Sequence, residues 1–155
     1  MFNISKIFIT IFYLGYSKII PGTIGSFVAF IIIYLAYMSL NKIYLYIFFI
    51  VCFFLSLYLI NFYQKTIKKI DSSEIIIDEF LGVFIIFLFF DYYSKLNIYF
   101  FFFISFLLFR FFDIYKPFPI KWIDKKIKNS YGFIFDDIVA GIYSSVCLII
   151  INEFI

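Results

Sequence analysis

Long uncharged apolar runs dominate the sequence, and they predict helices that cross a membrane. A soluble domain of 155 residues has no need of such runs. Only the second run reaches the roughly 20 residues that usually span a bilayer, because charged side chains interrupt the ends of the others. We therefore expect the helices to continue past the hydrocarbon, with their acids at its boundary. The five runs are residues 24–40, 43–63, 80–90, 96–109 and 138–151.

The first twenty residues have a different character. Residues 2–20 are expected to form an amphipathic helix that lies in the membrane interface. The pair Pro21-Gly22 then ends that helix and redirects the chain. The predicted fold is therefore all-α, a polytopic membrane helical bundle of about four to five membrane helices plus an N-terminal interfacial helix. Residues 1–155 are expected to form a single domain.

Composition agrees with a membrane protein and adds little chemistry. Hydrophobic residues make up 65% of the chain, against roughly 45–50% in soluble domains. The mean hydropathy is +1.06. Aromatic residues, at 27%, are interpreted as lipid-facing bulk. Cys52 and Cys147 lie inside apolar runs without partner spacing, so they are predicted to be small buried hydrophobes. No cleavage site follows the N-terminal stretch, and no processing is expected.

Basic residues are distributed unevenly over the predicted connections. If all five runs cross, all but two of the 13 Lys and Arg residues fall on the side of the N-terminus, the exceptions being Lys42 and Lys95. Positively charged connections stay in the cytoplasm, so this side is predicted to be cytoplasmic. The same topology puts all the acids there except Asp91 and Glu153. We interpret most of the lysines as ordinary surface charges near an anionic leaflet.

Two acid pairs do not fit an ordinary loop. Asp78-Glu79 and Asp136-Asp137 are each flanked by apolar residues on both sides. An ionised carboxylate at the bilayer centre costs about 2.5 to 3.5 kcal/mol on insertion scales. The four acids therefore need a position at the membrane edge and a compensating charge, and a divalent cation is a suitable one.

The acid pairs share a local pattern, acid-acid-x-x-small. On a helix, Gly82 lies one turn beyond Asp78, and Gly141 lies one turn beyond Asp137. The surface beside each pair is therefore open to a metal, a phosphate or another helix. Small residues at a plain helix contact are the competing explanation.

Basic groups accompany a further acid near the end of the fourth run. Arg110 and Asp113 are three residues apart and share a helical face, and Pro117 ends the helix directly after Lys116. Arginine offers a planar fork to phosphate oxygens, and lysine offers a point charge. An Arg110–Asp113 ion pair with Lys116 reaching the interface explains the same residues.

A small polar cluster begins the first membrane run. Backbone amides at a helix N-terminus, with hydroxyls beside them, form a ready anion site, although ordinary capping explains the residues equally well. The candidate phosphate-binding residues here are Gly22, Thr23, Gly25 and Ser26.

Together these stretches resemble the phosphatidylglycerophosphatase A family, membrane enzymes of bacterial phospholipid synthesis. The motifs are Pro-Gly-Thr-x-Gly-Ser at 21–26, Asp-Glu-x-x-Gly at 78–82, Phe-Arg-x-x-Asp-x-x-Lys-Pro-x-Pro at 109–119, and Asp-Asp-x-x-Ala-Gly at 136–141. The resemblance implies a magnesium-dependent phosphatase of the bacterial inner membrane that converts phosphatidylglycerophosphate to phosphatidylglycerol. Tyr13 and Lys18 depart from the family pattern, as does Asn129-Ser130 in place of a glycine pair.

Absent residues restrict the chemistry independently. The chain has no histidine, no Asp-x-Asp and no Cys-x5-Arg, which excludes phosphohistidine, the usual aspartyl-phosphate signature and phosphocysteine. Carboxylate-bound metal remains, and Mg²⁺ suits such oxygen ligands better than zinc does.

Our hypothesis gathers the acids around one or two Mg²⁺ ions at the cytoplasmic membrane edge. The predicted metal ligands are Asp78, Glu79, Asp113 and Asp137. The predicted catalytic residues are Asp136, Asp137, Arg110 and Lys116, with Arg110 and Lys116 also binding phosphate. Helical geometry favours Asp137, above Gly141, as the better ligand and Asp136 as the base or a supporting partner.

Other functions are compatible with parts of this pattern. A transport or cation-pathway protein would also carry intramembrane acids, but at several depths. A phosphatidyltransferase would require an Asp-Gly-x-x-Ala-Arg opening, which residues 136–141 lack. The residues alone do not separate phosphatidylglycerophosphate from other lipid monophosphates as substrate. Lipids are the expected partners, with no nucleic acid and no identifiable protein partner.

Overall fold

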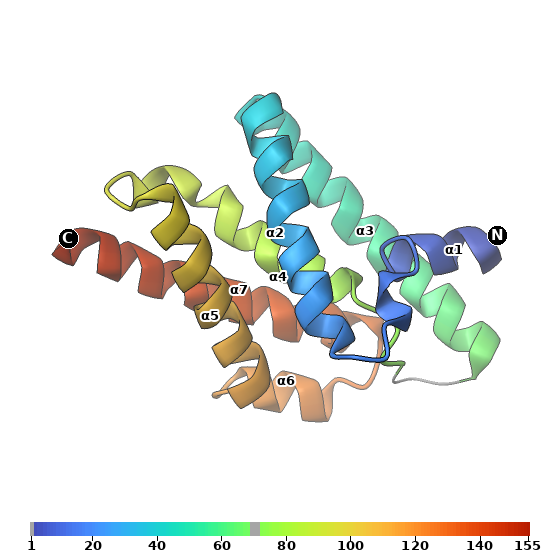
Figure 1. Ribbon diagram of the computed structural model, residues 1–155. Coiled ribbons are helices and arrows are strands. Elements are labelled where there is room, and N and C mark those ends of the chain that lie inside the picture. The colour runs from blue at the N-terminus through green and yellow to red at the C-terminus, as the bar shows by residue number, and fades with distance from the viewer. Residues whose placement is uncertain (1, 69–71) are drawn as a thin grey trace.

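A computed structural model describes residues 2–68 and 72–155, and this part of the chain is built of helices and turns without strands. The all-α prediction is confirmed. Figure 1 shows the arrangement. The elements are α1 (Phe2–Ile9), the 3-10 helix η1 (Leu14–Tyr16), α2 (Pro21–Ser39), α3 (Lys42–Ile67), α4 (Ile77–Leu88), the 3-10 helix η2 (Phe90–Tyr93), α5 (Ile98–Tyr115), α6 (Ile120–Lys126) and α7 (Ser130–Phe154).

Four helices, α2, α3, α5 and α7, are long and apolar enough to cross a membrane, and the chain is a multi-pass membrane protein. Two of them extend well beyond the predicted apolar runs at one end of the bundle. Helix α5 continues to Tyr115 and so includes Asp113, and α7 begins at Ser130, ahead of both its acids. These acids therefore lie in helix ends beyond the apolar runs, and their position at the hydrocarbon boundary stays a prediction.

Helix α4 corresponds to the third apolar run but differs from the long helices. Its 12 residues span about 18 Å, short of the roughly 30 Å of bilayer hydrocarbon. Nearly every residue is buried, and the helix packs chiefly against α7 and α2. A helix that is apolar on all sides fits this enclosed position, because other helices cover every face. Helix α4 is therefore a buried helix inside the bundle.

The glycines beside the acid pairs form the contact between α4 and α7. A Cβ on Gly82 would lie 2.6 Å from the Asp137 carbonyl oxygen, and one on Gly141 would lie 2.2 Å from the Gly82 carbonyl oxygen. The two backbones touch here, so neither position tolerates a side chain. Of the explanations considered for these small residues, the approach of another helix is the one confirmed.

The N-terminal segment departs from its prediction, since helix α1 ends at Ile9 and a single helix over residues 2–20 is wrong. Residues 11–13 all have positive φ, which a right-handed helix excludes. The turn brings Gly15 against the backbone of Glu74, where a Cβ would lie 1.9 Å from the carbonyl oxygen. Ile76 N–H donates to the Ile9 carbonyl at 3.0 Å. These tertiary contacts with the connection to α4 override the local helical pattern.

Pro21 also has a role other than the expected one. It stands at the start of α2 and begins that helix, where its missing N–H costs nothing. The preceding residue, Ile20, takes the left-handed conformation with φ of 47° and makes the change of direction. The prediction that Pro21-Gly22 redirects the chain is therefore wrong by one residue. The change of direction occurs at Ile20, and Pro21-Gly22 forms the first turn of α2.

Candidate active site

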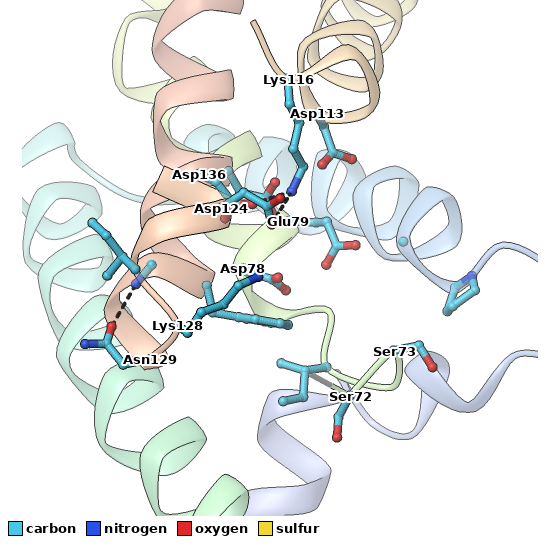
Figure 2. A pocket seen from close by; sticks show the side chains of 17 residues that line it. Ser72, Ser73, Asp78, Glu79, Asp113, Lys116, Asp124, Lys128, Asn129 and Asp136 are labelled. Carbon is cyan, nitrogen blue, oxygen red and sulfur yellow. Dashed lines mark hydrogen bonds and ion pairs between the residues drawn. The ribbon is translucent and has the colours of Figure 1, made fainter. Parts of the chain in front are cut away.

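A cavity of about 370 Å³ opens at the end of the bundle where α2, α4 and α7 begin and α5 ends. The connection before α4 and the connection between α6 and α7 complete its walls. Figure 2 shows labelled acids from α4, α5, α6 and α7 around this space. Charged groups from distant parts of the sequence therefore share one enclosed site.

Three carboxylates form the floor of the cavity. Oxygen atoms of Asp78, Glu79 and Asp137 all lie within 4.8 Å of one another. Asp78 is 7% exposed and Asp137 is 4% exposed. Asp78 Oδ1 and Glu79 Oε2 are buried without a hydrogen-bond partner in the described chain. Like charges so close and so poorly solvated repel one another, and a bound cation would relieve this repulsion.

The glycine contact explains why these acids meet. Helices α4 and α7 both begin at the cavity and run in the same direction away from it. Gly82 and Gly141 touch, and Asp78 and Asp137 each stand one turn before their glycine. Close backbone packing thus brings the first turns of the two helices together with their acids facing each other.

Asp136 faces a different partner from its neighbour. Lys116 Nζ donates to Asp136 Oδ2 at 2.5 Å and also lies 3.2 Å from Asp124 Oδ1. Burial alone would lower the pKa of Lys116, but these acids, Asp136 foremost, raise it overall. Asp136 Oδ1 is buried without a partner in the described chain. The two adjacent acids therefore divide as helical geometry indicates, with Asp137 in the cluster and Asp136 beside a lysine. Their chemical roles stay predictions.

Arg110 lies behind the cavity wall. Its Nη1 donates to Asp113 Oδ2 at 2.6 Å and to Ser26 Oγ at 3.5 Å, while Nε is buried without a partner in the described chain. Asp113 lines the cavity and Arg110 does not. The ion pair considered from the sequence is present, and Arg110 as a phosphate ligand stays a prediction that requires its release from Asp113.

The 21–26 motif contributes less to the cavity than its residue types suggest. Gly22 lines it, and a Cβ there would lie 2.3 Å from Glu79 Oε1. Thr23 N–H already donates to the Ile20 carbonyl, and the Ser26 hydroxyl donates to the Gly22 carbonyl. Gly25 faces Ile76, and a Cβ on Gly25 would lie 3.0 Å from the Cβ of Ile76. Thr23, Gly25 and Ser26 do not line the cavity, and their phosphate contacts stay predictions.

Comparison with known proteins decides the family. The profile of the family described as "Phosphatidylglycerophosphatase A" matches residues 7–152. The chain is 39% identical to the Haemophilus influenzae (strain ATCC 51907 / DSM 11121 / KW20 / Rd) phosphatidylglycerophosphatase A over 137 residues, which cover 85% of this chain and 78% of the relative. It is 33% identical to the Escherichia coli (strain K12) phosphatidylglycerophosphatase A over 140 residues, covering 90% and 78%. The chain belongs to the phosphatidylglycerophosphatase A family. No solved structure shows significant similarity to it.

Membership of the phosphatidylglycerophosphatase A family makes the chain a phosphatase, a hydrolase of lipid metabolism. The resemblance drawn from the four motifs is confirmed. These motifs lie on α2, α4, the end of α5 and the start of α7, the elements that surround the cavity. The cavity therefore lies where these four motifs meet.

Several residues that line the cavity of this chain were not predicted from the sequence. They are Ser72, Ser73, Asp124, Lys128 and Asn129. Asp124 and Lys128 belong to a lysine-rich stretch that is typical of solvated surface, but Pro117 and the short helix α6 fold this stretch over the cavity. Asn129, a departure from the family pattern, accepts hydrogen bonds from the N–H groups of Tyr131 and Gly132 and so caps α7. The preference of asparagine for helix N-caps was the one sequence feature that could have indicated any of these five residues, and it concerns Asn129.

Proposed function

We propose that this protein hydrolyses the terminal phosphomonoester of phosphatidylglycerophosphate, yielding phosphatidylglycerol and phosphate, with Mg²⁺ as cofactor. The observation that carries the proposal is the buried cluster of Asp78, Glu79 and Asp137 beneath a cavity at one end of the membrane helices. Both relatives bear the name of this activity. A phosphate attached to a lipid stays near the membrane surface, where this cavity opens.

The donor set suits Mg²⁺. The three acids supply hard oxygen atoms, two of which are buried without a partner in the described chain, and Asp113 lies on the same cavity. The sequence holds no histidine that would favour zinc. When bound, the ion supplies positive charge that neutralises the phosphate and polarises a water molecule. Asp78, Glu79 and Asp137 would hold it, with Asp113 as a further ligand.

The remaining charged residues act on the substrate and the water. Lys116 places its ammonium group at the cavity wall and stabilises the phosphate oxygens as negative charge redistributes. Asp136, through its unpartnered Oδ1, accepts a proton from the attacking water. The water oxygen then bonds to phosphorus as the bond from phosphorus to the glycerol oxygen breaks, and the leaving alkoxide takes up the proton that Asp136 accepted. Release of Arg110 from Asp113 would add a second cation to the phosphate.

We place the cavity on the cytoplasmic face of the bacterial inner membrane. Among the described residues, Lys and Arg side chains gather at the cavity end, while Lys42 and Lys95 stand at the opposite end. The positive-inside rule supports this orientation. The acids meet in one cavity at one end instead of lining a route at several depths, which argues against a transport pathway.

Phosphate release from purified protein in neutral detergent tests the proposal. Phosphatidylglycerophosphate, phosphatidate, lysophosphatidate and a water-soluble aryl phosphate are compared, each with Mg²⁺ and with EDTA. We expect the fastest release from phosphatidylglycerophosphate and none with EDTA. Equal rates on the soluble ester contradict a dedicated lipid phosphatase, and full activity in EDTA contradicts the metal assignment.

A further inference from the structure

We propose that Asp124 is a positioning residue of the phosphatase, which holds the ammonium group of Lys116 where it meets the phosphate. This inference rests on the proposed function. Asp124 lies on α6, outside the four sequence motifs, and its side chain lines the cavity. It does not contact the substrate itself. Its effect on hydrolysis passes through Lys116.

Two acids from different helices hold the Lys116 ammonium group. Nζ lies 2.5 Å from Asp136 Oδ2 and 3.2 Å from Asp124 Oδ1, and all three residues line the cavity. Figure 2 shows the Lys116 side chain extending from the end of α5 toward both carboxylates. An ammonium group has three donors, so one is left for an oxygen atom in the cavity. The lysine is thus oriented before the substrate binds.

The ion pair of Asp124 is not a local surface contact. Asp124 is the one acid of α6, and the same helix carries Lys121, Lys125 and Lys126. Lys121 precedes it by three residues, a spacing at which helical side chains can pair. In the described chain, however, its ion pair is with Lys116, at the end of α5. The contact therefore joins two separate elements at the cavity wall.

Helix α6 is anchored without this ion pair. Ile120, at its start, is fully buried, and the helix packs against α7. The Tyr143 hydroxyl of α7 donates to the Phe118 carbonyl at 3.0 Å. The Asp124 side chain is 41% exposed, and a pair of this kind adds little to stability. Loss of its carboxylate therefore leaves α6 in place and frees only the Lys116 side chain.

The charge of Asp124 determines how its loss should appear in the kinetics. A carboxylate on the cavity repels an anionic substrate, so Asp124 does not serve phosphate binding. Without it, Asp136 alone holds Lys116, and one contact leaves the long, flexible side chain more freedom. The ammonium group is then less well placed as negative charge redistributes. Removal of the Asp124 charge therefore lowers kcat without raising KM.

The test measures kcat and KM on phosphatidylglycerophosphate with Mg²⁺ in neutral mixed micelles. We expect Asp124→Asn to lower kcat about tenfold, with KM unchanged or lower. Asp124→Glu keeps the charge and should restore most of the loss, because the exposed side chain has room for one more methylene group. The matched control is Asp91→Asn, which removes a similarly exposed acid paired with a lysine at the opposite end of the bundle and should change neither value.

A double-mutant cycle shows whether the effect passes through Lys116. We expect Lys116→Met to lower kcat about 100-fold, and the addition of Asp124→Asn to cause no further loss. An unchanged kcat in Asp124→Asn, or a further tenfold fall in the double variant, would overturn the positioning role.

Thermal unfolding in detergent separates positioning from a structural role. Asp124→Asn should melt at the temperature of the wild-type protein. A lowered melting temperature together with a raised KM would show that Asp124 supports the fold, and the positioning role would fail. Wild-type protein that does not hydrolyse phosphatidylglycerophosphate would instead overturn the proposed function, so the two failures are distinguishable.

Discussion

The two ends of the helix bundle treat their acids in opposite ways. At the far end, Asp91 accepts hydrogen bonds from Lys42 at 2.5 Å and from the Tyr37 hydroxyl at 2.7 Å, and it stays exposed. These two donors lower the pKa of Asp91. At the cavity end, Asp78 and Asp137 are buried against each other and Glu79. An exposed, paired acid needs no further partner, whereas a buried cluster of acids needs a bound positive charge to balance it.

Removing one acid from the cluster should produce the largest effect. We expect Asp78→Asn and Asp137→Asn to lower phosphate release about 100- to 1,000-fold at every Mg²⁺ concentration. Both proteins should still fold, because the change removes a charge repulsion and keeps the shape of the side chain.

Thermal unfolding in detergent separates this loss from misfolding. Mg²⁺ should raise the melting temperature of the wild-type protein and leave that of either variant unchanged, since only a ligand bound to the folded state stabilises it. Near-normal activity in both variants would remove the metal site from the proposal.

Separating α4 from α7 should have an intermediate effect. Gly141→Ala places a methyl group where the Gly82 carbonyl now lies, so the helices must move apart. We expect a loss of about 1–3 kcal/mol in the free energy of unfolding and a clear fall in activity, as the acids of the two helices separate. The matched control is Ile142→Ala, the next residue on α7, which is 40% exposed on the bundle surface. Equal stability and activity of the two variants would contradict the glycine contact.

The smallest effect is expected at the far end. Asp91→Asn removes an exposed ion pair with Lys42 and should cost less than about 1 kcal/mol in the free energy of unfolding. Phosphate release should match that of the wild-type protein. A loss of activity comparable to that of Asp78→Asn would show that the two ends are coupled, and the contrast between them would then fail.

Much of this architecture follows from the sequence because a bilayer leaves few choices. Uninterrupted apolar runs have to become helices, and charges beside them have to lie near the ends. Helical spacing also relates Asp137 to Gly141 and separates Asp136 from it. Each of the five predicted acids lies near the start or end of a helix that the sequence predicts, and these helix ends meet at one cavity.

The N-terminal turn and the cavity rim depend on contacts that no local pattern encodes. Residues 11–13 adopt positive φ because Gly15 packs on Glu74, more than fifty positions away. Ser72 and Lys128 reach the cavity through connections whose course is set by the helices around them. A single sequence gives no reason to choose Lys128 over its neighbouring lysines. Local patterns therefore predict the floor of the site and leave its rim open.

The enclosed position of α4 has a consequence for biogenesis. The ribosome delivers α4 to the membrane before α7, so during synthesis the two acids of α4 and the bare face of Gly82 lack their final cover. Completion of the last helix supplies Asp137 and the surface that Gly82 packs against. A chain that ends before Ser130 would expose α4 to lipid and would hold only part of the acid cluster. Activity should therefore appear only once the C-terminal helix has entered the membrane and packed against α4.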